Sequence, residues 1–198
     1  MFRILTETPR DSAEVEFLLD LAFAPGRTAL SSYRLRDGVD PIAELSLVAR
    51  DEYDVLAGAI RYWPVLVGAA ADPALLLGPV AVHPTRQGEG LGAILIDESL
   101  WRAGRRGWSR VILVGDEPYY RRFGFGRAAA RSLEYPPPTN PDRLLARALV
   151  PGAFADVAGL VRRWEGAGLP TARGAPESGG EPRLALDVGS GNAGGKKC

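Results

Sequence analysis

The chain has little of several features that mark particular classes of protein. Its 198 residues include one cysteine, Cys198, and one histidine, His83. A single cysteine allows no internal disulfide, so a reducing compartment is expected. The 24 basic and 24 acidic side chains cancel, so no broad positive field attracts nucleic acid or an anionic membrane. No apolar run approaches the roughly 20 residues of a membrane-spanning helix, and the first residues lack the apolar core of a signal peptide. We therefore expect a cytoplasmic protein whose partners include neither membrane nor nucleic acid.

What the chain does have is the composition of an ordinary folded domain. The hydrophobic share is 46% and the charged share 24%, values typical of soluble globular proteins. The richness in alanine, glycine and arginine favours a bacterial source. From residue 165 onward the chain becomes rich in glycine and proline, and such a segment buries too little apolar surface to fold. The sequence predicts one domain over residues 1–164 and a disordered tail over 165–198.

The first part of the chain alternates short apolar and helical patterns. Residues 2–5 suit a strand, and Asp11 or Ser12 can cap a helix whose apolar stripe runs from Val15 to Phe23. That helix should close at residues 25–26, and a second short helix is expected over 28–35. Two β-rich runs, 44–49 and 55–67, flank a polar break and predict a hairpin.

The middle of the chain carries its strongest motif. An apolar strand over 74–82 is followed by Pro84 and by three glycines at alternate positions, Gly88, Gly90 and Gly92, and a helical pattern then begins. Glycines let a ligand approach the backbone, and the free N–H groups of a helix N-terminus attract anions. The pattern predicts a phosphate or pyrophosphate site.

The spacing of the glycines selects among the known phosphate motifs. The G-x-G-x-x-G of dinucleotide folds does not match, and the loop has no P-loop lysine. Gln87-x-x-Gly90-x-Gly92, preceded by Val-x-Val-His-Pro, resembles the coenzyme A-binding motif of the GNAT superfamily of N-acetyltransferases. A plain glycine-rich turn without a ligand is the alternative for this motif taken alone.

A second motif lies at the distance that the same superfamily requires. Residues 110–115 suit a buried strand, and Tyr120-x-x-x-Gly124-Phe125 follows it. This pattern looks like the next motif of the superfamily, and the doubled tyrosine with Arg-Phe-Gly-Phe is similar to its YhbS-type bacterial members. The two motifs in order are far more specific than either one alone.

The resemblance implies an α/β (α+β) fold of the GNAT type. Its central sheet would be mixed and mostly antiparallel, flanked by helices, with a splayed pair of parallel strands at its centre. The helix after Gly90 is apolar on several sides, Trp101 included, which predicts that it is buried. Late strands are expected over 144–149 and 159–164, and the two N-terminal helices would line the acceptor side of the cleft.

The resemblance also implies a reaction: direct transfer of an acetyl group from acetyl-CoA to a primary amine, without a metal. The pyrophosphate would be held by backbone N–H groups of Gln87, Gly88, Glu89, Gly90, Leu91 and Gly92. The pantetheine arm and thioester would meet unpaired backbone groups of Val80, Ala81 and Val82. Tyr120 would be the general acid that protonates the leaving thiolate, which suits a phenol with a pKa near 10.

Several points stay open from the sequence. Arg86 is either a phosphate ligand or a solvated loop residue. The strand over 74–82 carries no acid, and nothing selects Asp116, Glu117, Asp72 or His83 as the general base, so none is assigned. A module that binds acyl-CoA without turnover, or an acyltransferase for longer chains, is the alternative function. The acceptor is a small molecule or a protein amine, and the protein is a monomer or a homodimer.

Overall fold

The computed structural model describes residues 1–23, 27–29 and 31–166. The predicted helix end at residues 25–26 and nearly all of the predicted disordered tail lie outside these residues. The helices and strands, in chain order, are β1 (Arg3–Thr6), α1 (Ser12–Phe23), α2 (Ser31–Arg34), β2 (Leu47–Arg50), β3 (Leu56–Val67), β4 (Asp72–Val82), α3 (Leu91–Arg105), β5 (Arg110–Val114), α4 (Glu117–Tyr120), α5 (Arg127–Ala130), β6 (Leu133–Glu134), β7 (Leu144–Ala148) and β8 (Gly159–Arg163). Short 3-10 turns separate several of them.

A twisted sheet forms the middle layer of the molecule, with strand order β1-β2-β3-β4-β5-β7. Neighbouring strands on this path are antiparallel except for β4 and β5, which run parallel because α3 crosses over between them. β8 joins the far end of β3 and pairs with the short β6. The expected mixed, mostly antiparallel sheet with one parallel pair is therefore confirmed.

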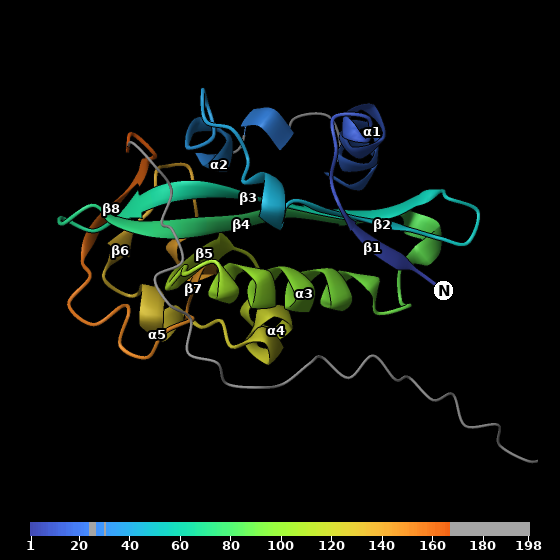
Figure 1. The fold of residues 1–198 in the computed structure, drawn as a ribbon. Coiled ribbons are helices and arrows are strands. Elements are labelled where there is room, and N and C mark those ends of the chain that lie inside the picture. The colour runs from blue at the N-terminus through green and yellow to red at the C-terminus, as the bar shows by residue number, and fades with distance from the viewer. Residues whose placement is uncertain (24–26, 30, 167–198) are drawn as a thin grey trace, which may run out of the picture.

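Helices cover both faces of the sheet (Figure 1). α1 and α2 lie on one face, and α3, α4 and α5 lie on the other. The core under α3 is the larger one and includes Leu91, Leu95 and Ile96, packed against β3 and β4. The core under α1 gathers Val15, Leu18 and Leu19 against β2, β3 and β4. A site at the side of β4 can therefore be lined by residues from both faces of the sheet.

α3 differs from the expectation that it is buried on several sides. Its buried residues occupy the face toward the sheet, whereas Trp101 is 44% exposed. The Arg105 guanidinium lies 5.1 Å from the centre of the Trp101 ring. Because α3 covers one face of the sheet and has solvent on its other side, its outer apolar residue is shielded by a cation rather than by a core.

The remaining elements follow the sequence closely, with shifts at their ends. Pro64 lies within β3, at a point between the stretch that pairs with β2 and the stretch that pairs with β8. The missing N–H of proline is tolerated at such a gap. α5 and β6 are additions that the sequence did not predict, because each is too short to show a periodic pattern. None of the helices that the structure describes is both long and apolar enough to cross a membrane.

Candidate functional site

A β-bulge opens the edge of β4 at the centre of the sheet. Leu77 pairs with Tyr62 and Val80 pairs with Ile60, so Gly78 and Pro79 together stand opposite the single residue Arg61. An extra residue on one strand bends that strand and redirects the residues after it. Pairing of β4 with β5 is limited to Leu75–Val111 and Leu76–Ile112, just before the bulge. Beyond these pairs the two parallel strands splay apart, as the resemblance implied.

The register of β4 shows which backbone groups face the splay. The His83 amide donates to the Ala57 carbonyl (2.8 Å), so this pair is a hydrogen-bonded one in the antiparallel ladder. Hydrogen-bonded and non-hydrogen-bonded pairs alternate along such a ladder. The pair of Ala81 with Ala59 is therefore also hydrogen-bonded, and the backbone groups of Ala81 point toward β3. Val80 and Val82 therefore present their N–H and C=O groups to the open side. This corrects the expectation for Ala81, whose backbone groups are directed into the sheet.

The conformation of the glycine loop between β4 and α3 leaves its backbone accessible to a ligand. His83 accepts a hydrogen bond from the Thr85 amide (3.3 Å) and so caps the 3-10 turn Pro84–Arg86 that begins the loop. Gly88 and Gly90 have positive φ angles of 85° and 76°, a region that side chains disfavour. A Cβ built on either glycine would have no neighbour within 4 Å. The backbone here is exposed to a space that a ligand can enter.

Five consecutive amides, in this loop and at the start of α3, have no acceptor among the described residues. Within the part of the chain that the structure describes, the N–H groups of residues 88–92 donate to no protein acceptor, whereas those of Ala93 and Ile94 already bond the Gly90 carbonyl. The N-terminus of α3 adds the positive end of the helix dipole. The arrangement can bind a pyrophosphate through backbone donors alone.

A cavity of about 340 Å³ lies over this loop. Its lining includes Val82, Gln87, Gly88, Gly90, Leu91 and Gly92, together with Arg86, Tyr119 and Arg122. Arg86 bonds the carboxylate of Asp51 (2.7 Å), so its charge is already paired. Arg122 stacks on Tyr119, 4.1 Å from the ring centre, and no carboxylate of the described residues pairs with it. The sequence did not single out Arg122, since an arginine in a motif rich in arginine carries no distinguishing signal.

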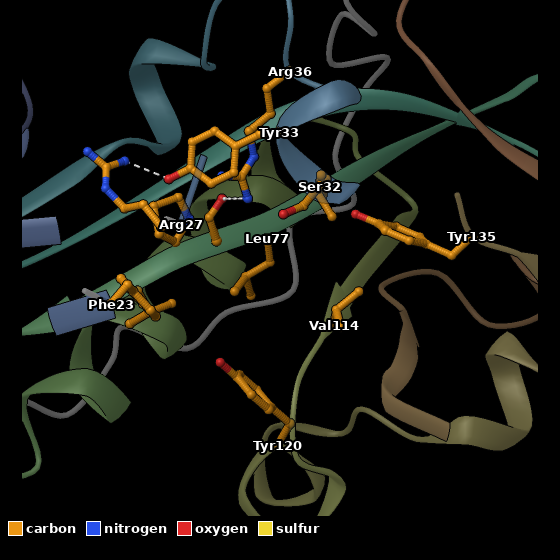
Figure 2. A pocket seen from close by; sticks show the side chains of 13 residues that line it. Phe23, Arg27, Ser32, Tyr33, Arg36, Leu77, Val114, Tyr120 and Tyr135 are labelled. Atoms are coloured by element: carbon orange, nitrogen blue, oxygen red, sulfur yellow. Dashed lines mark hydrogen bonds between the residues drawn. The ribbon is translucent and has the colours of Figure 1, made fainter. Parts of the chain in front are cut away.

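A second cavity, of about 160 Å³, lies at the bulge. Figure 2 shows Tyr120 approaching it from one side while Ser32, Tyr33 and Arg36 approach from the other. Gly78, Pro79 and Val80 form the β4 wall. Because α2 and α4 lie on opposite faces of the sheet, this cavity occupies the gap that the splay leaves between β4 and β5.

Tyr120 is placed in that cavity by aromatic packing and by a glycine. Its ring makes an edge contact with Tyr119 (5.0 Å between ring centres) and another with Phe125 (6.1 Å). Any side chain at Gly115 would collide with the Tyr120 ring, which explains the glycine at the end of β5. Burial raises the pKa of the Tyr120 phenol to about 12, so the group carries its proton at neutral pH. Tyr119 instead places its hydroxyl 3.1 Å from where a Cβ on Gly92 would lie.

The acids considered from the sequence are not gathered at the cavity. Asp72 pairs with Arg110 (3.2 Å), Asp116 pairs with Arg143 (3.2 Å), and Glu117 accepts a bond from the Arg127 amide (3.4 Å). Among the described residues, no carboxylate and no histidine lines the cavity at the bulge. Two further residues that do line it, Arg36 and Tyr135, were missed from the sequence, because they come from segments with no recognisable motif.

No metal centre is visible in the described part of the chain. Within residues 1–23, 27–29 and 31–166, no three His, Cys, Asp or Glu side chains are placed to share an ion. The donors that the site offers are backbone amides, phenols and guanidinium groups.

Comparison with known proteins supports a relationship for most of the chain. A family profile described as an acetyltransferase (GNAT) domain matches residues 43–127. YhbS of Escherichia coli (strain K12), an uncharacterized N-acetyltransferase, is 30% identical over 162 residues, which span 82% of this chain and 96% of YhbS.

Solved structures give the same relationship in three dimensions. The crystal structure of E. coli YhbS in complex with CoA superposes with a TM-score of 0.71 at 30% identity, over 83% of this chain and 90% of that one. A GNAT family acetyltransferase from Brucella melitensis in complex with acetyl-CoA superposes with a TM-score of 0.58 at 32% identity, over 76% of this chain and 90% of that one. The residues that the family profile matches, 43–127, contain both motifs and strands β2 to β5.

Proposed function

The chain belongs to the GNAT acetyltransferase family, and on that premise we propose that it transfers the acetyl group of acetyl-CoA directly to a primary amine. The observation that carries the proposal is the position of the two cavities on one strand edge. Val82 and Tyr119 line the cavity over the glycine loop, and Val80 and Tyr120 line the cavity at the bulge. One elongated ligand along β4 would reach both, with its phosphates at one end and its thioester at the other.

The phosphate end of acetyl-CoA belongs at the glycine loop in this proposal. The free amides of residues 88–92 would bind the pyrophosphate, with Gln87 lining the same cavity. Arg122 would supply a charge-assisted hydrogen bond, since its guanidinium has no carboxylate partner among the described residues. Acetyl-CoA and CoA in the two solved relatives support this choice of cosubstrate.

The reacting end belongs at the bulge. The amine nitrogen attacks the thioester carbonyl carbon, and the oxygen that becomes negative accepts a hydrogen bond from the Val80 N–H, which faces the splay. The C–S bond then breaks, and Tyr120 donates its proton to the leaving thiolate. The acceptor nitrogen loses one proton, which restores the phenol through solvent, so the proton count balances.

The absence of an acid from the described lining of this cavity has a mechanistic consequence. We assign no general base, and infer that the acceptor reacts as the free amine and releases its proton to water. The same observation favours a second candidate function, a module that binds acyl-CoA with little turnover. The two candidates share the donor site and differ only in the rate of acetyl transfer.

The proposal extends to the setting of the protein. Residues 1–164 would act as the catalytic domain of a cytoplasmic bacterial enzyme, as a monomer or a homodimer. Its partners would be acetyl-CoA and a small-molecule or protein amine.

Calorimetric titration with acetyl-CoA, with NAD and ATP as controls, tests the donor. We expect binding of acetyl-CoA alone, with a dissociation constant in the micromolar range. Thiol release from acetyl-CoA with a panel of amines then separates the two candidates. Binding without thiol release would favour the non-catalytic module, and no binding would refute both.

A further inference from the structure

The α2 side of the cavity at the bulge holds an arginine in an unusual setting. The Arg36 guanidinium lies between the rings of Tyr33 and Trp63, 4.7 and 4.5 Å from their centres. One of its terminal nitrogens donates to the Gly78 carbonyl in the bulge (2.9 Å). The guanidinium is thus held flat and directed at the wall of the cavity (Figure 2).

The charges around this cavity do not balance. Arg27, also in its lining, bonds the carboxylates of Asp20 (2.7 Å) and Glu16 (2.5 Å). Arg36 has no carboxylate partner among the described residues, and its buried Nε has no hydrogen-bond partner there. Burial lowers the pKa of Arg36, which means that its charged form is under-compensated by its surroundings. An arginine nonetheless keeps its charge in a protein.

A second unpaired donor lines the same cavity. The Tyr135 hydroxyl is buried and has no hydrogen-bond partner in the described structure. The loop that carries it is tied to α2, because the Ser31 hydroxyl contacts the Thr139 hydroxyl (2.5 Å). A buried polar group without a partner is destabilising, so two such groups in one cavity indicate a missing ligand.

From these contacts we propose that the acceptor is a small amine that also carries a carboxylate, which Arg36 and Tyr135 bind while the amine faces Val80 and Tyr120. The proposal rests on the proposed acetyl transfer and names its acceptor class. A carboxylate supplies oxygens that can accept hydrogen bonds from both unpaired donors. The planar guanidinium matches the geometry of a carboxylate. Among the described residues, Arg36 is the one cation of this lining without a carboxylate partner, and a volume of about 160 Å³ fits a single carboxylate on a short chain.

A series of ω-amino acids tests this class and measures its length. Thiol release from acetyl-CoA is followed with β-alanine, 4-aminobutanoate, 5-aminopentanoate and 6-aminohexanoate, each against the alkylamine of equal carbon number. We expect kcat/KM for at least one amino acid to exceed that of its alkylamine by about 100-fold, since the alkylamine leaves the two donors unpaired. Equal values across every pair would overturn the proposal.

Variants identify the residues responsible. Arg36→Gln and Tyr135→Phe should each raise KM for the preferred amino acid about tenfold or more, and should change KM for the alkylamine by a much smaller factor. Arg36→Lys should recover part of the loss, which a purely structural role for the stacked guanidinium would not allow. Arg34→Gln, which removes an exposed charge at the end of α2, two residues before Arg36, is the matched control. Equal loss for amino acid and alkylamine in Arg36→Gln would refute the assignment.

A binding measurement keeps the inference separate from the proposed function. The N-acetylated form of each ω-amino acid and its neutral amide are titrated calorimetrically into the protein, with and without saturating CoA. Tighter binding of the carboxylate, lost in Arg36→Gln, supports the site even if no amine is acetylated. Failure of acetyl-CoA to bind refutes the proposed function alone, whereas equal binding of carboxylate and amide refutes the carboxylate site alone.

Discussion

Arg86 and Asp51 form a hydrogen-bonded ion pair of 2.7 Å that joins the glycine loop to the turn between β2 and β3. Asp51 is almost fully buried and also accepts bonds from the amides of Tyr53 and Val55 (3.0 Å each). Burial by itself would raise the pKa of Asp51, but these two amides and Arg86 hold it below its ordinary value. The pair gives Arg86 a role that neither alternative from the sequence described, because Arg86 braces the loop with its charge already neutralised.

This pairing predicts a contrast between two arginines of the same cavity. Arg122→Gln should weaken acetyl-CoA binding about tenfold or more, since a hydrogen bond to a charged group contributes roughly 1.5–3 kcal/mol. Arg86→Gln should change the dissociation constant less than about threefold, because its charge is not free for the ligand. Calorimetry measures both, and Arg121→Gln, which removes a mostly exposed neighbouring charge, is the control. A larger effect at Arg86 than at Arg122 would contradict the assignment.

Gly90 tests the backbone site directly. Gly90→Glu should abolish acetyl-CoA binding, because it places a negative side chain in the space over the free amides. The positive φ of 76° also penalises any side chain, by roughly 1–2 kcal/mol. Gly90→Ala carries the same backbone penalty without the charge, so it should bind measurably, though more weakly. If both variants lost binding equally, the glycine would be needed for its backbone conformation and not for anion recognition.

Tyr120→Phe should lower kcat by about 100-fold or more and leave acetyl-CoA affinity within about twofold. Phenylalanine keeps the ring contacts with Tyr119 and Phe125 and removes only the proton donor. Since the pKa of Tyr120 is raised to about 12, its ionisation should contribute no decline of kcat between pH 7 and about pH 10. Steady-state thiol release over this range checks both statements, with Tyr119→Phe as the neighbouring control. An unchanged kcat in Tyr120→Phe would remove it from the mechanism.

Alkaline pH should destabilise the fold through its buried phenols. Burial raises the pKa of Tyr62, Tyr120 and Tyr135, and that of Tyr120 reaches about 12. The unfolded chain ionises near pH 10, so the stability is complete below that pH and falls as the pH rises toward the folded values. Each phenol should cost roughly 1 kcal/mol of unfolding free energy by pH 11.

Denaturant unfolding at intervals from pH 8 to pH 11 measures this loss. Tyr120→Phe should show a shallower decline than the parent, because one ionising group has been removed. Tyr53→Phe, at a residue that is 79% exposed, should follow the parent curve. Parallel curves for all three proteins would show that the buried phenols are not the cause.

Much of the fold was predictable because its signals are local. The β-branched and leucine residues of 110–115 indicated a buried strand, and residues 144–149 were predicted as a late strand; the structure confirms them as β5 and β7. The stripe of Val15, Leu18 and Leu19 located the buried face of α1. α3 was predicted as a helix but not as a one-sided one, because periodicity does not show which apolar face meets solvent.

The sequence by itself determined the glycine loop, the start of α3 and the position of Tyr120 after β5, because turn chemistry and short motifs depend on neighbouring residues. Only the tertiary structure decided which groups meet at the cavity. After the bulge at Gly78 and Pro79, the backbone groups of Val80 and Val82 face the open side, and those of Ala81 pair with β3. This depends on the register between β3 and β4, which the sequence of one strand does not specify. Arg36 and Tyr135 come together from segments about a hundred residues apart, and long-range packing of this kind leaves no periodic or local trace in the chain.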